Sequence, residues 1–230
     1  MICIAISAED HSSAMEKSHK AIQNGADFIE IRVDHFKNPF NTDFAKLVQG
    51  IQSKLILTIR KTDEGGEFAF EENQRIELIK RAIDSRPYAV DLELSMDLST
   101  LTALIAQAKQ KDVRTILSYH DFQKTPDISK MKDIIVDATK KQADFVKIIG
   151  TAISIEDNLK FLSLPHFAKE HKIQIITFAM GSKGIISRIL SPIFGAAFTF
   201  AALDKPTAPG QISIKEMKKN LETFTSYNRK

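Results

Sequence analysis

Short apolar runs alternate with amphipathic stretches along the whole chain. The runs are rich in Ile, Val, Phe and Leu, which is typical of strands buried on both faces of a sheet. They predict strands at residues 2–7, 27–33, 55–60, 88–94, 114–120, 144–149, 173–179 and 196–203.

The stretches between these runs have helical periodicity. They predict a helix after each strand, with examples at residues 14–24, 71–84, 98–109, 128–140, 155–170 and 214–223. Strict alternation of strands and helices predicts an α/β protein with a parallel sheet. Eight such units in 230 residues predict a single (β/α)8 TIM barrel domain over residues 1–230, since barrels of this kind usually have about 250 residues. A doubly wound open sheet is the alternative, but it normally has a glycine-rich turn after its first strand, and "ISAEDHSS" (6–13) contains no glycine.

Composition narrows the function classes without selecting one. The net charge is +3 and the basic residues are scattered, so no nucleic-acid interface is indicated. The one cysteine, Cys3, lies in an apolar run and excludes a disulfide framework. The first residues resemble no secretory signal, and no apolar stretch approaches the roughly 18 residues of a membrane-spanning helix. We therefore expect a cytoplasmic protein with no membrane partner.

Charged residues gather where the predicted strands end, which is where a (β/α)8 barrel carries its active site. Because burying a charge costs several kcal/mol, such residues indicate ion pairs or function. They are Glu30, Arg32, Asp34, Arg60, Asp91, Glu93, His120 and Lys147. The i, i+2 spacing of Glu30, Arg32 and Asp34 places them on one side of their strand. For Asp34 and Asp91 we expect ion pairs within the core.

Lys147 lies in "DFVKIIG", which is apolar on both sides of the lysine. A neutral amine in a water-poor pocket is what Schiff-base chemistry requires. An ion pair with Glu30 or Glu93 would explain a buried lysine equally well, so the strand pattern alone leaves both interpretations open.

His120 ends the strand that precedes the one carrying Lys147, in "SYHDFQKTP" (118–126). Neighbouring strands are about 4.8 Å apart, so both side chains can reach one substrate. An iminium acidifies the adjacent C–H bond, and an imidazole can take that proton and return it to a leaving group. The pair therefore favours catalysis over a structural histidine.

Three loops add candidates. "RKTDEGGEF" (60–68) carries Glu64, which could orient an imidazole or belong to a plain turn. "AMGSKGIISR" (179–188) opens a helix whose N-terminus could bind an anion, and its Arg188 could grip a carboxylate or a phosphate. "DKPTAPGQIS" (204–213) offers Thr207 and Gln211 on a loop that could act as a lid or be a surface turn.

Seven segments together resemble the type I 3-dehydroquinate dehydratases of the shikimate pathway. They are "EIRVDHF", "TIRKTDEGGEF", "VDLEL", "SYHDFQKTP", "DFVKI", "MGSKGIISR" and "APGQIS", in the family's order from residue 30 to residue 213. The resemblance implies a (β/α)8 fold, a homodimer and no metal or organic cofactor. The implied reaction is loss of water from 3-dehydroquinate to give 3-dehydroshikimate.

The resemblance also implies roles for individual residues. Lys147 is similar to the Schiff-base lysine that captures the C3 ketone, and His120 to the acid–base that removes the C2 proton and protonates the departing C1 hydroxyl. Glu64 resembles the carboxylate that positions this histidine, and Arg188 the grip on the substrate carboxylate. The positions matching residues that hold ring hydroxyls are Glu30, Arg32, Arg60 and Gln211, with Thr207 where the family often has serine and Ser7 a weaker match.

Two other functions share these features. A class I aldolase acting on a phosphorylated sugar would also use a Schiff-base lysine, but it would need a phosphate cradle after the seventh and eighth strands. A non-catalytic barrel that binds a small acid would explain the arginines, but not a buried lysine beside a histidine.

Overall fold

The computed structural model describes residues 1–227. Its strands are β1 (Ile2–Ser7), β2 (Phe28–Arg32), β3 (Lys54–Thr58), β4 (Ala89–Glu93), β5 (Arg114–His120), β6 (Phe145–Thr151), β7 (Gln174–Met180) and β8 (Thr199–Ala201). Its α-helices are α1 (His11–Gln23), α2 (Phe44–Gly50), α3 (Glu72–Asp84), α4 (Leu98–Gln110), α5 (Ile128–Lys140), α6 (Asp157–Glu170), α7 (Ile185–Leu190) and α8 (Ile214–Tyr227). Short 3-10 helices are η1 (Val33–His35), η2 (Pro39–Asn41), η3 (Thr62–Glu64) and η4 (Ser182–Gly184).

The strands form one sheet in the order β7-β6-β5-β4-β3-β2-β1-β8. The first and last strands of the chain are parallel neighbours, with Ile2 opposite Thr199 and Ile4 opposite Ala201. Strand order, parallel pairing and alternation with helices are those of a (β/α)8 barrel, so the predicted fold class is confirmed. Within residues 1–227, no helix is long and apolar enough to cross a membrane.

The chain divides into two compact units. The N-terminal unit is Ala5–Leu117 and the C-terminal unit is Met1–Ile4 with Ser118–Lys230. The prediction of one catalytic domain over residues 1–230 stays a prediction.

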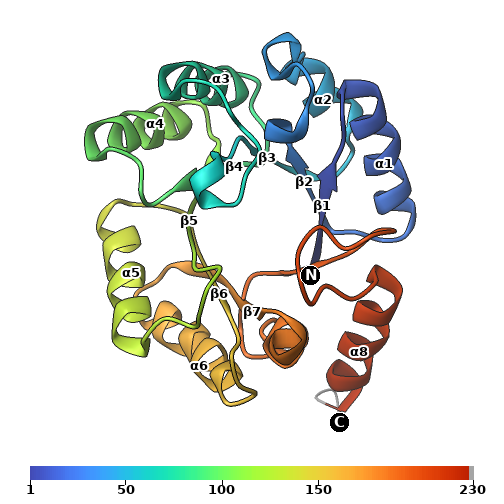
Figure 1. The fold of residues 1–230 in the computed structure, drawn as a ribbon, viewed down its shortest axis with the longest axis vertical. Coiled ribbons are helices and arrows are strands. Elements are labelled where there is room, and N and C mark those ends of the chain that lie inside the picture. Colours follow the sequence, from blue (N-terminus) through green and yellow to red (C-terminus); the bar gives the residue numbers. More distant parts are fainter. Residues whose placement is uncertain (228–230) are drawn as a thin grey trace. The chain divides into compact units, whose positions relative to one another are not determined.

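In the N-terminal unit, β2, β3 and β4 pair in parallel and bury nearly every side chain. Helices α3 and α4 lie side by side over these strands (Figure 1). Helix α4 begins at a side-chain cap, because Asp97 accepts hydrogen bonds from the N–H groups of Ser99 and Thr100. This cap fixes where the loop after β4 joins α4.

In the C-terminal unit, β6 and β7 pair in parallel over seven residues each, from Phe145 opposite Gln174 to Thr151 opposite Met180. Helix α6 packs on β7, and α5 packs on both α6 and β6. Buried Phe161 and Leu164 provide part of the apolar face of α6.

Four turns that follow helices share one backbone feature. Arg86, Asp112, Gln142 and Lys172 follow α3, α4, α5 and α6 and adopt φ values of 57°, 57°, 59° and 57°. This left-handed conformation ends each helix and turns the chain toward the next strand. None of the four residues is glycine.

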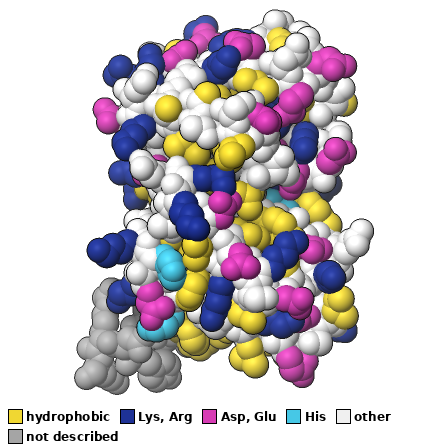
Figure 2. Space-filling model, turned by 90° about the vertical axis from the view of Figure 1, so that its left-hand side faces the viewer, with side chains coloured by type: hydrophobic (Ala, Val, Ile, Leu, Met, Phe, Trp, Pro, Cys, Tyr) yellow, Lys and Arg dark blue, Asp and Glu magenta, His cyan; other side chains and the backbone are white. Residues whose placement is uncertain are grey.

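The structure corrects several predicted boundaries. Helix α2 lies outside the residue ranges given for the predicted helices; it has only seven residues and starts at the cap Asp43, so it is too short for a clear periodic pattern. Strand β8 has three residues instead of eight. Arg60 lies beyond the end of β3, and Asp34 lies in η1 rather than in β2. Figure 2 shows cationic and anionic side chains interspersed on the face it presents, without a broad basic patch there.

Candidate active site

Lys147 comes from the middle of β6 and is only 5% exposed. Its Nζ lies 4.8 Å from the centre of the Phe200 ring on β8. A ring face attracts a cation but cannot accept its charge as a carboxylate can. The buried amine therefore has an aromatic ring of the same unit as one of its contacts.

His120 lies at the end of β5, half-buried, with its ring stacked on Phe122 at 5.9 Å between centres. The N–H of Asp121 donates to the carbonyl of Ile149 at 2.9 Å, which in a parallel ladder aligns His120 with Ile149. Because Ile149 and Lys147 are two residues apart on β6, His120 and Lys147 lie on the same face of the sheet. The predicted proximity holds, with His120 two residues nearer the C-terminal end of the strands than the level of Lys147.

Arg188 lies in α7 and is 1% exposed. Its guanidinium lies 4.1 Å from the centre of the Phe178 ring, and one NH2 group donates to the carbonyl of Pro209 at 3.2 Å. Its Nε is buried and makes no hydrogen bond to any described residue. Burial lowers the pKa of Arg188 to about 9, so the group still carries its charge at neutral pH. The site holds a buried cation that lacks an anion at Nε.

Phe178 and Phe200 connect these two cations. Their ring centres are 6.1 Å apart, and Phe178 pairs with Ile149 in the β6–β7 ladder. The row therefore runs from Lys147 over the two rings to Arg188, on the face that carries His120. Both phenylalanines are absent from the set of site residues predicted from the sequence. The available signal was their position in apolar strands, Phe178 in "TFAM" and Phe200 in "FTFA".

Polar contacts anchor helix α7, which has six residues. The Ser187 hydroxyl accepts from the N–H of Ala179, and the Ser187 N–H donates to Asn158 Oδ1, both at 2.9 Å. These bonds fix the residue that precedes Arg188. Anion binding by the N-terminus of this helix or by Arg188 stays a prediction.

The loop after β8 carries the remaining candidates of this unit. Gln211 Oε1 accepts from the backbone N–H of Thr207 at 2.8 Å and from its hydroxyl at 3.1 Å. Gly210 has φ 76°, and a Cβ there would lie 2.3 Å from the carbonyl oxygen of Gly181. The Gly181 N–H donates to Pro209 at 3.2 Å, so this end of the loop is docked on the start of the 181–188 segment.

In the N-terminal unit the predicted polar residues pair with one another. Arg60 donates to Asp91 at 2.6 Å, with side chains 5% and 1% exposed, and Glu30 accepts from the Thr58 hydroxyl at 2.6 Å. Burial acts to lower the pKa of Arg60, but the charges of Asp91, Glu30 and Glu93 outweigh it and raise this pKa. The predicted core pairing of Asp91 is confirmed.

Arg32 and Asp34 form a two-point ion pair, from Nε at 2.9 Å and NH2 at 2.6 Å. Burial acts to raise the pKa of Asp34, yet the hydrogen bond and charge of Arg32 lower it overall. Asp34 also accepts from the N–H of Glu67 at 3.1 Å, so the pair ties the end of β2 to the loop after β3. Ser7, at the end of β1, has its hydroxyl 2.8 Å from Nδ1 of His35.

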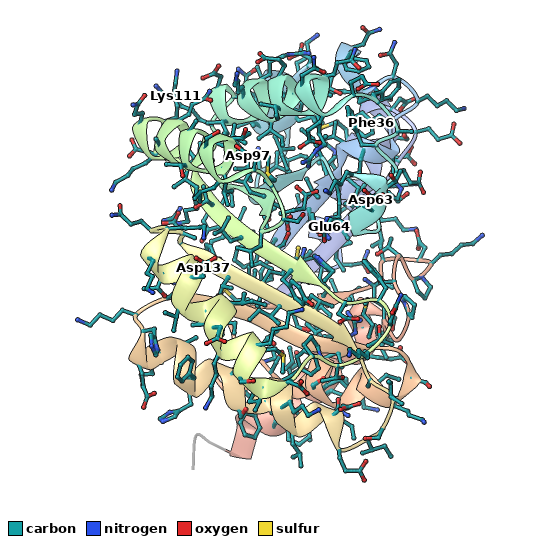
Figure 3. The ribbon with its side chains drawn as sticks, turned by 60° about the vertical axis from the view of Figure 1, so that its left-hand side comes forward. Phe36, Asp63, Glu64, Asp97, Lys111 and Asp137 are labelled. Carbon is teal, nitrogen blue, oxygen red and sulfur yellow. The ribbon has the colours of Figure 1, made fainter. Side chains whose placement is uncertain are left out.

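Glu64 ends η3 in the loop between β3 and α3, where Figure 3 labels it beside Asp63. Its carboxylate accepts from the Ser95 hydroxyl at 2.6 Å. The adjoining turn is tight: a Cβ at Gly66 would lie 2.1 Å from the carbonyl oxygen of Arg60. Backbone therefore approaches closely at the paired glycines, whereas a role for Glu64 toward an imidazole stays a prediction.

Each unit thus gathers its own part of the predicted set. The C-terminal unit places Lys147, His120 and Arg188 along one face of its strands, with Thr207 and Gln211 on its last loop. The N-terminal unit brings Arg32 beside Asp34 and Arg60 beside Asp91. In residues 1–227, no group of three or more His, Cys, Asp or Glu side chains is arranged to hold a metal ion.

Comparisons with known proteins give one family for nearly the whole chain. The family model of type I 3-dehydroquinase matches residues 2–228. The 3-dehydroquinate dehydratase of Methanococcus maripaludis is 36% identical over 223 residues, covering 96% of this chain and 99% of the relative. That of Pyrococcus abyssi is 36% identical over 220 residues, covering 95% of each chain.

Solved structures agree. The type I 3-dehydroquinate dehydratase of Clostridium difficile, solved with covalent modified comenic acid, has a TM-score of 0.90 at 29% identity, covering 98% of this chain and 92% of that one. The deoxyribose phosphate aldolase of Aeropyrum pernix has a TM-score of 0.61 at 13% identity, a likeness of fold alone. From the family match and these relatives we conclude that the chain belongs to the type I 3-dehydroquinase family.

Proposed function

We propose that this protein is a 3-dehydroquinate dehydratase that removes water from 3-dehydroquinate to give 3-dehydroshikimate in the shikimate pathway. Membership of the type I family carries the reaction. The single structural observation that carries the mechanism is Lys147, a 5% exposed amine on the sheet face that also carries His120.

Lys147 begins the reaction. Its neutral amine attacks the C3 ketone, and loss of one water gives an iminium. The iminium withdraws electrons from the C2–H bond, which makes this proton removable without a metal ion. Hydrolysis of the iminium after elimination returns water to C3 and frees the lysine, so the net change is loss of one water from C1 and C2.

His120 moves the protons. Its imidazole takes the C2 proton, the C1–O bond breaks, and the same imidazole delivers a proton to the departing hydroxyl. We propose that Glu64 keeps this imidazole oriented. The support for Glu64 is its place in "DEGGE" and its fixed carboxylate on Ser95.

Arg188 binds the substrate carboxylate in this proposal. The supporting observation is its buried Nε, which has no hydrogen-bond partner among the described residues. A carboxylate would accept two parallel bonds from the guanidinium and neutralise its charge. Ring hydroxyls are bound by Glu30, Arg32, Arg60, Thr207, Gln211 and Ser7, a set supported by the family's motif positions.

The test is borohydride trapping. Adding 3-dehydroquinate and borohydride should increase the protein mass by a reduced adduct on the peptide that holds Lys147. Lys147→Ala should lose the adduct and at least about 10⁴-fold in kcat, as removal of a covalent nucleophile does. His120→Ala should keep the adduct and lose about 10²- to 10⁴-fold in kcat. Substantial turnover by Lys147→Ala would overturn the mechanism; an enone product without an adduct would keep the reaction and remove the Schiff base.

We further propose a homodimer in the cytoplasm. Its support is the resemblance to the family, and light scattering coupled to gel filtration gives the mass in solution. A monomer at micromolar concentration would contradict it.

A further inference from the structure

Ser7, His35 and Asp34 lie in a row within the N-terminal unit. The Ser7 hydroxyl is 2.8 Å from Nδ1 of His35. On the other edge of the ring, Nε2 is 3.6 Å from Asp34 Oδ2 and has no hydrogen-bond partner among the described residues. The row therefore joins a hydroxyl, an imidazole and a buried carboxylate in that order.

Charged groups from three segments face this imidazole. Arg32 and Glu30 come from β2, Asp34 from η1, and Glu67 from the loop after β3, with Glu67 Oε1 3.5 Å from Nδ1. Lys17 of α1 donates to the carbonyl oxygen of Ser7 at 2.7 Å. Burial, followed by the charge of Arg32, lowers the pKa of His35 against the opposing effect of Asp34, Glu67 and Glu30.

A neutral imidazole carries one N–H, and its partners decide which nitrogen holds it. Asp34 is fully buried, whereas the Glu67 side chain beside Nδ1 is 65% exposed and its charge is screened by water. The carboxylate of Asp34 therefore favours the proton on Nε2. Nδ1 is then an acceptor, so the Ser7 hydroxyl donates its hydrogen to the ring and turns its oxygen lone pairs away from it. In this state Ser7 can only accept a hydrogen bond from a ligand.

We propose that His35 is a positioning residue: it fixes the Ser7 hydroxyl as an acceptor for a hydroxyl group of the substrate. This inference rests on the proposed function, since it takes Ser7 to be a substrate contact. It assigns His35, which the chemistry of the reaction does not use, a share in substrate binding.

Protonation of His35 reverses the bond to Ser7. Both ring nitrogens then donate, Nδ1–H occupies the serine oxygen, and the serine hydrogen points outward. A substrate hydroxyl would lose its acceptor, so KM should rise as the pH falls through the lowered pKa of His35, which lies below the ordinary histidine value of about 6.5. The rate of the bound complex should change little, because Ser7 does not take part in proton transfer.

The experiment is to measure KM and kcat for 3-dehydroquinate from about pH 5 to about pH 8 in five proteins besides the wild type. They are His35→Phe, His35→Asn, Ser7→Ala, the double variant Ser7→Ala with His35→Phe, and His166→Gln. Asparagine keeps an acceptor near the position of Nδ1 but does not titrate. His166 is 83% exposed on α6 and is the matched control.

At about pH 7.5 His35→Phe and Ser7→Ala should each raise KM about fivefold, the value of one neutral hydrogen bond. The double variant should raise it no further, because both changes remove the same contact. His35→Asn should keep a KM near that of the wild type and lose the rise at low pH. His166→Gln should follow the wild type throughout.

Three results would overturn the inference. One is a KM of His35→Phe within about twofold of the wild type at every pH. Another is a double variant whose effect equals the product of the two single effects. The third is an unchanged pH dependence in His35→Asn, which decides the matter even if circular dichroism shows that His35→Phe is unfolded.

Failure of the proposed function would look different. If the wild type neither turns over 3-dehydroquinate nor forms the borohydride adduct on Lys147, both the dehydratase assignment and the role of His35 are wrong. If adduct and turnover are normal and only the KM pattern fails, His35 alone loses its role.

Discussion

Buried cationic side chains contact different kinds of group in the two units. In the N-terminal unit Arg32, Arg60 and Arg75 each donate to a carboxylate, with Arg75 NH1 2.6 Å from Glu93. In the C-terminal unit Lys147 and Arg188 each lie over a phenylalanine ring, at 4.8 Å and 4.1 Å. A carboxylate neutralises the charge of a buried guanidinium, whereas a ring attracts a cation without neutralising it. Nε of Arg188 in addition has no hydrogen-bond partner among the described residues.

The two kinds of contact should respond differently to substitution. A paired arginine is already stabilised in the free protein, and its removal leaves an isolated buried carboxylate. In the proposed function, Arg188 gains further stabilisation when the substrate carboxylate binds. We therefore expect loss of Arg75, which the proposed function does not use, to reduce mainly stability, and loss of Arg188 to reduce mainly substrate affinity; loss of Arg32 or Arg60 should reduce both.

The largest expected effect is on stability. Arg75 is fully buried and donates to Glu93, Glu72 and the carbonyl of Ile59. Arg75→Met should lower the free energy of unfolding by about 3–5 kcal/mol, because it strands the buried Glu93. Urea denaturation measures this, and combining the change with Glu93→Leu should restore most of the loss. A single variant as stable as the wild type would remove the contrast between the units.

Arg188→Met gives the opposite pattern. The free energy of unfolding should be unchanged or higher, because a buried charge without an anionic partner is removed. KM should rise between about tenfold and about a hundredfold, the value of hydrogen bonds to a charged group. Steady-state kinetics and urea denaturation of one preparation separate the two effects. Lost stability with an unchanged KM would show instead that Arg188, like Arg75, contributes mainly to stability.

The ion pair of Asp34 in the N-terminal unit should stabilise the protein in a pH-dependent way. The pKa of Asp34 is lowered in the folded protein, so its contribution is present above its unfolded pKa, near 3.9, and is lost as the pH falls through the folded value. Asp34→Asn should cost about 1.5 kcal/mol at pH 7. The difference in the free energy of unfolding between Asp34→Asn and the wild type should shrink below about pH 4. Thermal denaturation of both proteins across this pH range measures it. A difference of constant size would contradict the ion pair.

The smallest effect concerns the rings. Phe178→Leu keeps apolar volume but removes the face beneath Arg188. We expect KM to rise about fivefold, a loss of about 1 kcal/mol, which lies within the range of about 0.5–2 kcal/mol for cation–ring contacts. Phe161→Leu, a buried phenylalanine of α6 in the same unit, is the matched control for lost packing. Equal changes in both variants would show that the ring acts only by filling space.

Much of this arrangement was predictable from strand ends. Lys147 and His120 stood out because a polar residue in an apolar run needs a reason, and their positions on neighbouring strands predicted that both can reach one substrate. Their common face follows from the register of the two strands, which the structure supplies. Arg188 was found as a charge, but its burial depends on the anchoring of α7 by Ser187 and Asn158, which are far apart in the sequence. The choice between an ion pair and a ring as the partner of a cation is a tertiary property, and no local pattern contains it.

The four left-handed residues that follow α3, α4, α5 and α6 have a practical consequence. An L-residue with a side chain pays a steric penalty there that glycine and asparagine avoid. Replacing Arg86, Gln142 or Lys172 by asparagine should raise the free energy of unfolding by up to about 1 kcal/mol each, whereas Asp112 already tolerates this conformation as asparagine does. These turns lead into the starts of strands, away from the ends that carry Lys147 and His120. In laboratory evolution toward new substrates, the added stability would therefore offset destabilising substitutions in the loops at the other end of the strands.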